Sequence, residues 1–380
     1  MKKLISIALC AVMLLGVFCA MASCSKESYE IAVVTDVGQI NDKGFNQGTW
    51  EGAEAYAKKN NISVKYYQPA NGSDANDNDR IAAMRQAIKN GAKVIVTPGF
   101  LQATALRTVA AEHPEVKFVF VDGWTITDKV DETGKEVGTP FANITAIVYK
   151  EQESGYLAGY AVVKEGYEKL GFTAGGGGTN PACNRFGYGF VQGANAAAAE
   201  LGKTVTIKYS YKFGDNFSAS SELQAQIASW YAAGTEVVFA CGGSMFDSVK
   251  SAAAEYKDRN VKIVGVDTDQ SGESEQVITS AVKELATDVD IVLTQFYGGE
   301  WDSKLAGKTQ NLGAAENATG LPTATWRLTN FTVEQYKEVF EKIKNGTIVP
   351  DANTPGNATN IINQAKLQII GDNVQNADEI

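Results

Sequence analysis

Short apolar runs alternate with helical patterns along most of the chain. The first run, Ile31–Thr35, is rich in β-branched residues and leads into a polar loop, after which Phe45 and Asn46 open a helical pattern. Strand-type and helix-type segments continue to alternate up to residue 122. This β-α-β order predicts a parallel sheet covered by helices. Its right-handed crossovers bring the strand ends Asp36 and Asp122 to one edge.

A second set of alternating segments follows and resembles the first in its order. Its expected strands are Lys169–Thr173, Val205–Tyr211, Glu236–Ala240 and Val261–Val266. No linker of low complexity separates the two sets. We therefore expect an α/β protein with two similar three-layer α/β/α lobes that face one another across a hinge.

The expected domain boundaries follow from this alternation. Residues 29–149 plus about 272–309 form the expected first lobe, and residues 150–271 plus about 310–380 form the second. Beyond Asp267 the pattern predicts a strand at Glu275–Thr279 and an apolar helix at Asp288–Phe296. The Asn-rich tail after residue 350 predicts no particular structure.

The N-terminus has the features of an export signal over residues 1–23. Lys2 and Lys3 precede an apolar run, and small residues precede Cys24. The segment around Cys24 resembles a bacterial lipobox, which predicts a lipidated Cys24, a tether over residues 24–28, and a protein anchored at the cell membrane facing the outside or the periplasm. The alternatives are an ordinary signal peptide cut nearby or a single transmembrane helix.

Charge and residue content exclude several function classes. The chain has 380 residues, a formal net charge of -10 and no evident basic stripe, which argues against a nucleic-acid partner. It has one His, His113, and neither a CxxC nor an HExxH motif, so we expect no metal and no catalytic residues. The run Gly175–Gly178 lacks the GxGxxG spacing of a dinucleotide-binding enzyme, and no cofactor is expected.

The cysteines do not form a disulfide framework. Three of the five lie in the signal or at the expected anchor, which leaves Cys183 and Cys241. Their spacing does not decide whether these two pair.

Polar, aromatic or glycine residues stand directly after five of the expected strands. They are Asp36, Asp122, Phe217, Gly242 with Gly243, and Asp267. Strand ends on one side of a sheet converge in space, so these residues predict a small-molecule site in the crevice between the lobes. The carboxylates of Asp122 and Asp267 suit vicinal hydroxyls or a ring N–H.

Several motifs together resemble one known family. They are Asn41–Gln47 with Trp50-Glu51-Gly52, Val119–Asp122, Gly155–Gly159, Gly187–Phe190, Gly265–Gln270 and Thr279–Lys283. The combination is similar to the basic membrane protein (BMP) family of nucleoside-binding lipoproteins that serve ABC importers. The resemblance implies a type I periplasmic-binding-protein fold, ABC permease subunits as partners, and a purine nucleoside such as inosine, guanosine or adenosine as the ligand.

The resemblance also implies roles for single residues. Phe45 matches the first of two rings that hold the base, and Phe217 is expected to be the second, with Phe186 and Phe213 as rivals. Asn46 would address the base edge, and Asp36 would assist it.

For the ribose, the resemblance points to Asp122, Asp267 and Lys283. Gly242 or Gly243 would let the backbone approach the sugar. The chain departs from the family around Gly175–Gly178 and Pro181–Arg185, so contacts from Arg185 stay undecided.

Other interpretations stay open at this point. Phe45 could be a core residue, and Asp36 could merely cap the following helix. The same fold could bind a sugar or another small ligand for sensing. Asp36 and Asp42 loosely match the metal site of a nucleoside hydrolase, although the chain lacks a dense aspartate run.

Overall fold

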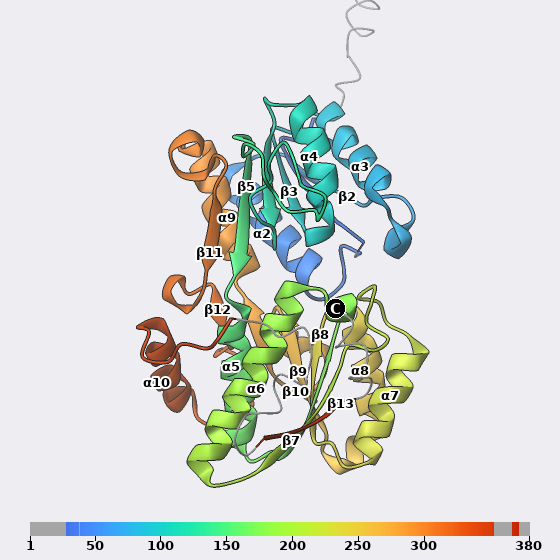
Figure 1. Cartoon of the computed structure of the whole chain (residues 1–380), viewed down its shortest axis with the longest axis vertical. Coiled ribbons are helices and arrows are strands. Elements are labelled where there is room, and N and C mark those ends of the chain that lie inside the picture. Colours follow the sequence, from blue (N-terminus) through green and yellow to red (C-terminus); the bar gives the residue numbers. More distant parts are fainter. Residues whose placement is uncertain (1–27, 38, 353–366, 372–380) are drawn as a thin grey trace, which may run out of the picture.

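The computed structural model describes residues 28–37, 39–352 and 367–371, and shows two lobes stacked along the long axis of the molecule (Figure 1). The expected export signal, Cys24 and all of the tether except its last residue lie outside the described residues. The fold is therefore discussed from residue 28 onward.

The first lobe has a parallel sheet in the order β11-β5-β4-β3-β1-β2. Its strands are β1 (Ile31–Val34), β2 (Val64–Tyr67), β3 (Val94–Pro98), β4 (Lys117–Val121), β5 (Ile144–Tyr149) and β11 (Thr309–Leu312). Its helices are α2 (Phe45–Asn60), α3 (Asp77–Lys89), α4 (Ala103–Glu112) and α9 (Leu285–Tyr297). Helices α2 and α9 share a core with one face of the sheet, and α3 and α4 share a core with the other.

Strand β1 illustrates why both faces need helices. Ile31 and Val33 point into the core beneath α2 and α9, whereas Ala32 and Val34 point into the core beneath α3 and α4. All four residues are fully buried. A strand that is apolar at every position fits a sheet covered on both sides.

The second lobe has the sheet order β12-β10-β9-β8-β6-β7-β13, in which β12 alone runs antiparallel to its neighbour. Its strands are β6 (Lys169–Ala174), β7 (Val205–Ser210), β8 (Val237–Cys241), β9 (Lys262–Asp267), β10 (Val277–Lys283), β12 (Thr319–Gly320) and β13 (Leu367–Gly371). Its helices are α5 (Glu151–Glu165), α6 (Pro181–Leu201), α7 (Ser221–Ala232), α8 (Met245–Glu255) and α10 (Val333–Lys344).

Short helical turns connect the longer elements. They are η1 (Gly72–Asp74), η2 (Phe100–Gln102), η3 (Gly176–Gly178), η4 (Lys257–Arg259), η5 (Gln270–Glu273), η6 (Trp301–Leu305) and η7 (Ala314–Glu316). Two of them, η3 and η5, follow the ends of the strands β6 and β9 with at most two residues between.

Helices α5 and α6 pack backbone to backbone. A Cβ on Gly155 or Gly159 of α5 would stand 2.3 or 2.0 Å from a carbonyl oxygen of α6. A Cβ on Gly189 or Gly193 of α6 would likewise stand 2.3 or 1.9 Å from one of α5. Glycine is therefore required at this crossing.

The chain crosses between the lobes three times: between β5 and α5, between β10 and α9, and between β11 and β12. The crossings are bonded to one another, because Lys150 N donates to Leu312 O at 2.8 Å and Glu284 N donates to Ala318 O at 2.9 Å. The buried Glu153 carboxylate accepts from Ala314 N at 2.6 Å. Three linked segments of this kind form a hinge between two rigid bodies.

One expected boundary differs from the observed sheets. We expected the first lobe to resume near residue 272, but β10 pairs with β9 in the second sheet. The chain returns to the first lobe only at α9, after Lys283. The strand runs on through Thr279 and Ser280, which pair with β9 and are buried, a position that their polar character does not reveal.

Candidate ligand-binding site

A cavity of about 460 Å³ lies between the lobes at the carboxyl ends of both sheets. Side chains or backbone from both lobes line it. The lining includes every residue that the sequence predicts for the site: Asp36, Phe45, Asn46, Asp122, Phe217, Gly242, Gly243, Asp267 and Lys283. The structure therefore brings all nine together, although they span almost 250 positions of the chain.

Several lining residues have a left-handed backbone. Asp122 has φ 56° and Asp267 has φ 65°, each at the end of its strand, and Phe217 has φ 59°. This conformation is uncommon for residues other than glycine, and strain of this kind concentrates at functional sites. Gly242 and Gly243 also have positive φ, of 147° and 42°, where glycine carries no such cost.

Two aromatic rings from opposite lobes line the cavity. Phe45 opens α2 in the first lobe, and Phe217 lies in the loop after β7 in the second. The ring of Phe217 rests against glycine backbone, since a Cβ on Gly175 would stand 2.2 Å from Phe217 Cδ1 and a Cβ on Gly242 would stand 3.1 Å from it. The run of glycines after β6 thus makes room for this ring.

The rival aromatics differ in their surroundings. Phe186 lines the cavity but is buried, with its ring edge-on to Phe239 in the core of the second lobe. Phe213 is not among the lining residues and packs against the core beneath α7 and α8. Of the three, only Phe217 both lines the cavity and stays partly exposed.

Asp42 organises the N-terminus of α2. Its carboxylate accepts hydrogen bonds from Gly44 N at 3.0 Å, Asn46 N at 3.0 Å and Gln47 N at 3.1 Å. Burial raises the pKa of Asp42, and these bonds oppose that rise. The side chain that caps this helix is therefore that of Asp42 and not that of Asp36. Both Asp42 carboxylate oxygens already accept hydrogen bonds from backbone N–H groups.

The same carboxylate orients Asn46. Asn46 Nδ2 donates to Asp42 Oδ2 at 3.0 Å, which leaves Asn46 Oδ1 buried without a hydrogen-bond partner among the described residues. Because an ionised carboxylate can only accept, the amide nitrogen of Asn46 must face Asp42. The free oxygen is then an acceptor for an N–H or O–H group in the cavity.

Asp36 follows the end of β1, lines the same cavity as Asn46 and is mostly buried. Its Oδ1 accepts from Val37 N at 2.6 Å. A Cβ on Gly99 would stand 2.1 Å from Asp36 Oδ2, so the glycine after β3 leaves space for this carboxylate.

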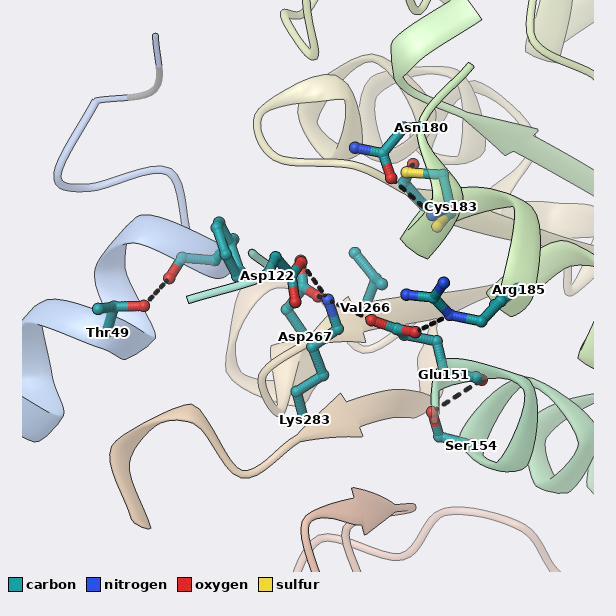
Figure 2. Close-up of polar contacts among 12 residues, drawn as sticks. Thr49, Asp122, Glu151, Ser154, Asn180, Cys183, Arg185, Val266, Asp267 and Lys283 are labelled. Carbon is teal, nitrogen blue, oxygen red and sulfur yellow. Dashed lines mark hydrogen bonds and ion pairs between the residues drawn. The ribbon is translucent and has the colours of Figure 1, made fainter. Parts of the chain in front are cut away.

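A buried cluster of charges forms the floor of the site (Figure 2). Lys283 Nζ lies 2.5 Å from Asp122 Oδ2, 3.2 Å from Glu151 Oε1 and 3.7 Å from Asp267 Oδ1. Arg185 Nε lies 2.5 Å from Glu151 Oε2. Three carboxylates thus share two cations, and Asp122 Oδ1 stays without a hydrogen-bond partner among the described residues.

The pKa values follow from this arrangement. Burial raises the pKa of Asp267 to about 7, against the opposing effect of Lys283. Burial would also raise the pKa of Glu151, but Lys283 and Arg185 together hold it below its usual value. Burial acts to lower the pKa of Lys283, yet the three carboxylates raise it, so the ammonium stays charged.

The sequence did not lead us to predict Glu151 as a site residue, and it left the contacts of Arg185 undecided. Glu151 is fully buried at the start of α5, directly after the crossing from β5, and Arg185 reaches it from α6. Glu151 follows β5 much as Asp36 follows β1 and Asp122 follows β4, so the same strand-end rule could have found it. No local signal marks Arg185.

Cys183 and Cys241 are both free and buried, and both line the cavity. Cys183 Sγ lies 3.9 Å from Cys241 O. Burial raises the pKa of the Cys241 thiol well above its usual value, and the neighbouring Cys183 raises it further. The question of pairing is thus answered for this structure: the two thiols are adjacent and unpaired.

Comparison with known proteins gives one family. Residues 29–354 match the model of the Bmp family, described as PnrA-like ABC transporter substrate-binding proteins. The chain is 27% identical over 336 residues to the ABC transporter nucleoside-binding protein BmpA of Lactococcus lactis, covering 83% of this chain and 88% of that one. It is 25% identical over 339 residues to basic membrane protein B of Borreliella burgdorferi, covering 87% and 89%.

Solved structures share the fold. An ABC transporter solute-binding protein from Aeropyrum pernix superposes with a TM-score of 0.68 at 20% identity, over 88% of this chain and 95% of that one. One from Conexibacter woesei gives 0.61 at 20% identity, over 84% and 98%. The two-lobed architecture is thus that of periplasmic binding proteins, as expected.

The comparisons also bear on location. A relative from Pyrococcus horikoshii that is named a lipoprotein is 26% identical over 307 residues, covering 77% of this chain and 69% of that one. Within the described part of the chain, every helix is too short or too polar to cross a membrane.

Proposed function

Since this chain belongs to the Bmp family of PnrA-like ABC transporter substrate-binding proteins, we propose that it captures a purine nucleoside in the cavity between its lobes. The observation that carries the proposal is the pair of aromatic residues, Phe45 and Phe217, that line one cavity from opposite lobes. Base stacking on aromatic side chains stabilises such complexes by about 1–3 kcal/mol per base. A relative is named as nucleoside-binding, which supports this choice of ligand.

The polar groups complement a nucleoside. Asn46 Oδ1 would accept from an N–H of the base, assisted by Asp36, and Asp122 Oδ1 would accept from a ribose hydroxyl. Asp267 and Lys283 would complete the ribose contacts, and Gly242 with Gly243 would allow the sugar to approach the backbone. Each unpartnered acceptor would then gain a hydrogen bond on binding.

In this proposal the ligand leaves the protein unchanged and passes to the permease subunits of an ABC importer. Cys24, outside the described residues, would carry the lipid that anchors the protein at the outer face of the membrane. Incubation with inosine and calcium should therefore release no ribose, and replacement of Cys24 by Ala should release the protein from the membrane.

The stacking arrangement is tested by titration calorimetry with inosine. Phe45→Leu and Phe217→Leu should each weaken binding by about 5- to 150-fold, because stacking contributes about 1–3 kcal/mol. The matched control is Phe213→Leu, which removes an aromatic outside the cavity lining and should leave affinity unchanged. Unaltered affinity in the Phe45 variant would show that the base is not held in this way.

A further inference from the structure

Lys43 belongs to the first lobe, and its side chain contacts the second lobe next to the cavity. It lies in the loop before α2, has a left-handed backbone with φ 59°, and lines the cavity. Its Nζ lies 2.9 Å from Glu273 Oε2, on η5, and 3.2 Å from Asp247 Oδ1, on α8. Both acidic residues belong to the second lobe.

The backbone of Lys43 is held from the same side. Its carbonyl oxygen accepts from Gln270 Nε2 at 2.8 Å and from Thr268 Oγ1 at 3.1 Å. The Gln270 side chain is held in place within its own lobe, because its Oε1 accepts from Val266 N at 3.0 Å. The second lobe therefore presents fixed donors to one peptide group of the first.

The acidic pair has a cation of its own. Lys250 Nζ, on α8, lies 2.8 Å from Asp247 Oδ1 and 3.6 Å from Glu273 Oε2. Lys250 and both acids belong to the second lobe, whereas Lys43 is the member of this cluster that comes from the first lobe. If the lobes part, Lys43 loses its partners and the acids keep Lys250.

We propose that Lys43 is an interlobe latch that determines ligand affinity by stabilising the closed arrangement of the lobes. Contacts that exist in one of two conformations shift the equilibrium toward that conformation. The four side chains of the charge cluster are between 27% and 39% exposed, so water screens the ion pairs and the latch stays weak enough to open. The Lys43 ammonium pairs with Asp247 and Glu273 and with none of the nine predicted ligand-binding residues, so we assign it a role in closure and not in holding the ligand.

The matched pair of variants is Lys43→Met and Lys250→Met. Both remove one positive charge from the same cluster, but only the first breaks a contact between lobes. Lys43→Met should weaken inosine binding by about 3- to 10-fold, the range expected for two partly exposed ion pairs. Lys250→Met should bind as tightly as the parent protein or more tightly, because the acids then have Lys43 as their remaining partner in the cluster.

Closure is measured directly as a distance between spin labels on Cys substituted for Ala82, on α3, and Ala225, on α7, both exposed positions on different lobes. Without added nucleoside, Lys43→Met should shift the distance distribution toward longer separations, and Lys250→Met should not. An unchanged distribution in Lys43→Met, or an equal shift in both variants, overturns the latch. This measurement needs no nucleoside, so its failure is distinguishable from failure of the proposed function, which a lack of inosine binding by the parent protein would reveal.

Discussion

Removal of the central cation from the buried charge cluster should destabilise the protein strongly and in a pH-dependent way. The Lys283 side chain is 2% exposed and lies within 4 Å of Asp122, Glu151 and Asp267. Breaking a buried ion pair by removing one partner costs about 3–5 kcal/mol, because the other charge stays buried without compensation. We therefore expect Lys283→Met to lower the free energy of unfolding by about 3–5 kcal/mol at pH 8.

The loss should shrink at lower pH. Asp267 has a pKa of about 7 with Lys283 present, and loss of the cation raises it further. Below pH 7 the Asp267 carboxyl group is neutral in the folded state of both proteins. Each pKa unit of that rise therefore removes about 1.4 kcal/mol from the difference in unfolding free energy between the parent protein and the variant. Glu151 keeps Arg185 as its partner and should contribute less to the change.

Urea unfolding followed by far-UV circular dichroism at pH 8 and pH 5.5 measures both effects. Lys250→Met is the control, since it removes a lysine from a partly exposed cluster and should cost less than about 1 kcal/mol at either pH. A loss below about 1 kcal/mol for Lys283→Met at pH 8, or a larger loss at pH 5.5 than at pH 8, would refute the account of the cluster.

Three further predictions concern other parts of the molecule. Gly175→Ala should weaken inosine binding by about 5- to 50-fold in calorimetry. The φ of Gly175, -77°, allows alanine, but the added Cβ would displace the Phe217 ring. Unchanged affinity would exclude a role for that ring. Asp42→Ala should lower the free energy of unfolding by about 1–2 kcal/mol in urea, because the N-terminus of α2 loses its cap; an unchanged midpoint would contradict this. Burial raises the pKa of Asp288, like that of Asp267, to about 7, so each folded carboxyl group holds a proton that the unfolded state releases, and each should lower stability by about 2 kcal/mol between pH 5.5 and 7. Asp288→Asn should remove about half of the decline seen in the parent protein, and an equally steep decline in the variant would assign it to other groups.

The alternation of strands and helices predicted the fold well because each lobe is built from local β-α units. The exceptions are strands whose position is set by distant partners. β11 (Thr309–Leu312) is polar in sequence and forms as an edge strand beside β5. β13 (Leu367–Gly371) lies in an Asn-rich tail and adds to the edge at β7. β11 lacks the apolar pattern that marks a buried strand, and β13 is a short apolar run inside a polar tail.

The site was predictable to the extent that it lies at strand ends. Asp122 and Asp267 follow apolar strands and could be placed together from topology alone. Lys43 and Arg185 could not, because their partners lie in another lobe or on another helix, at separations of 204 and 34 residues. Contacts between two lobes or two helices depend on how these pack together. They produce no periodic pattern in the sequence of either one.

Titration calorimetry of the purified protein with inosine, guanosine, adenosine, thymidine, ribose and riboflavin determines whether the cavity holds a purine nucleoside. We expect one site per chain, tightest binding by a purine nucleoside, and much weaker binding by free ribose, which cannot stack between Phe45 and Phe217. Ribose bound as tightly as the nucleosides, or no heat with any purine nucleoside, would contradict the proposed function.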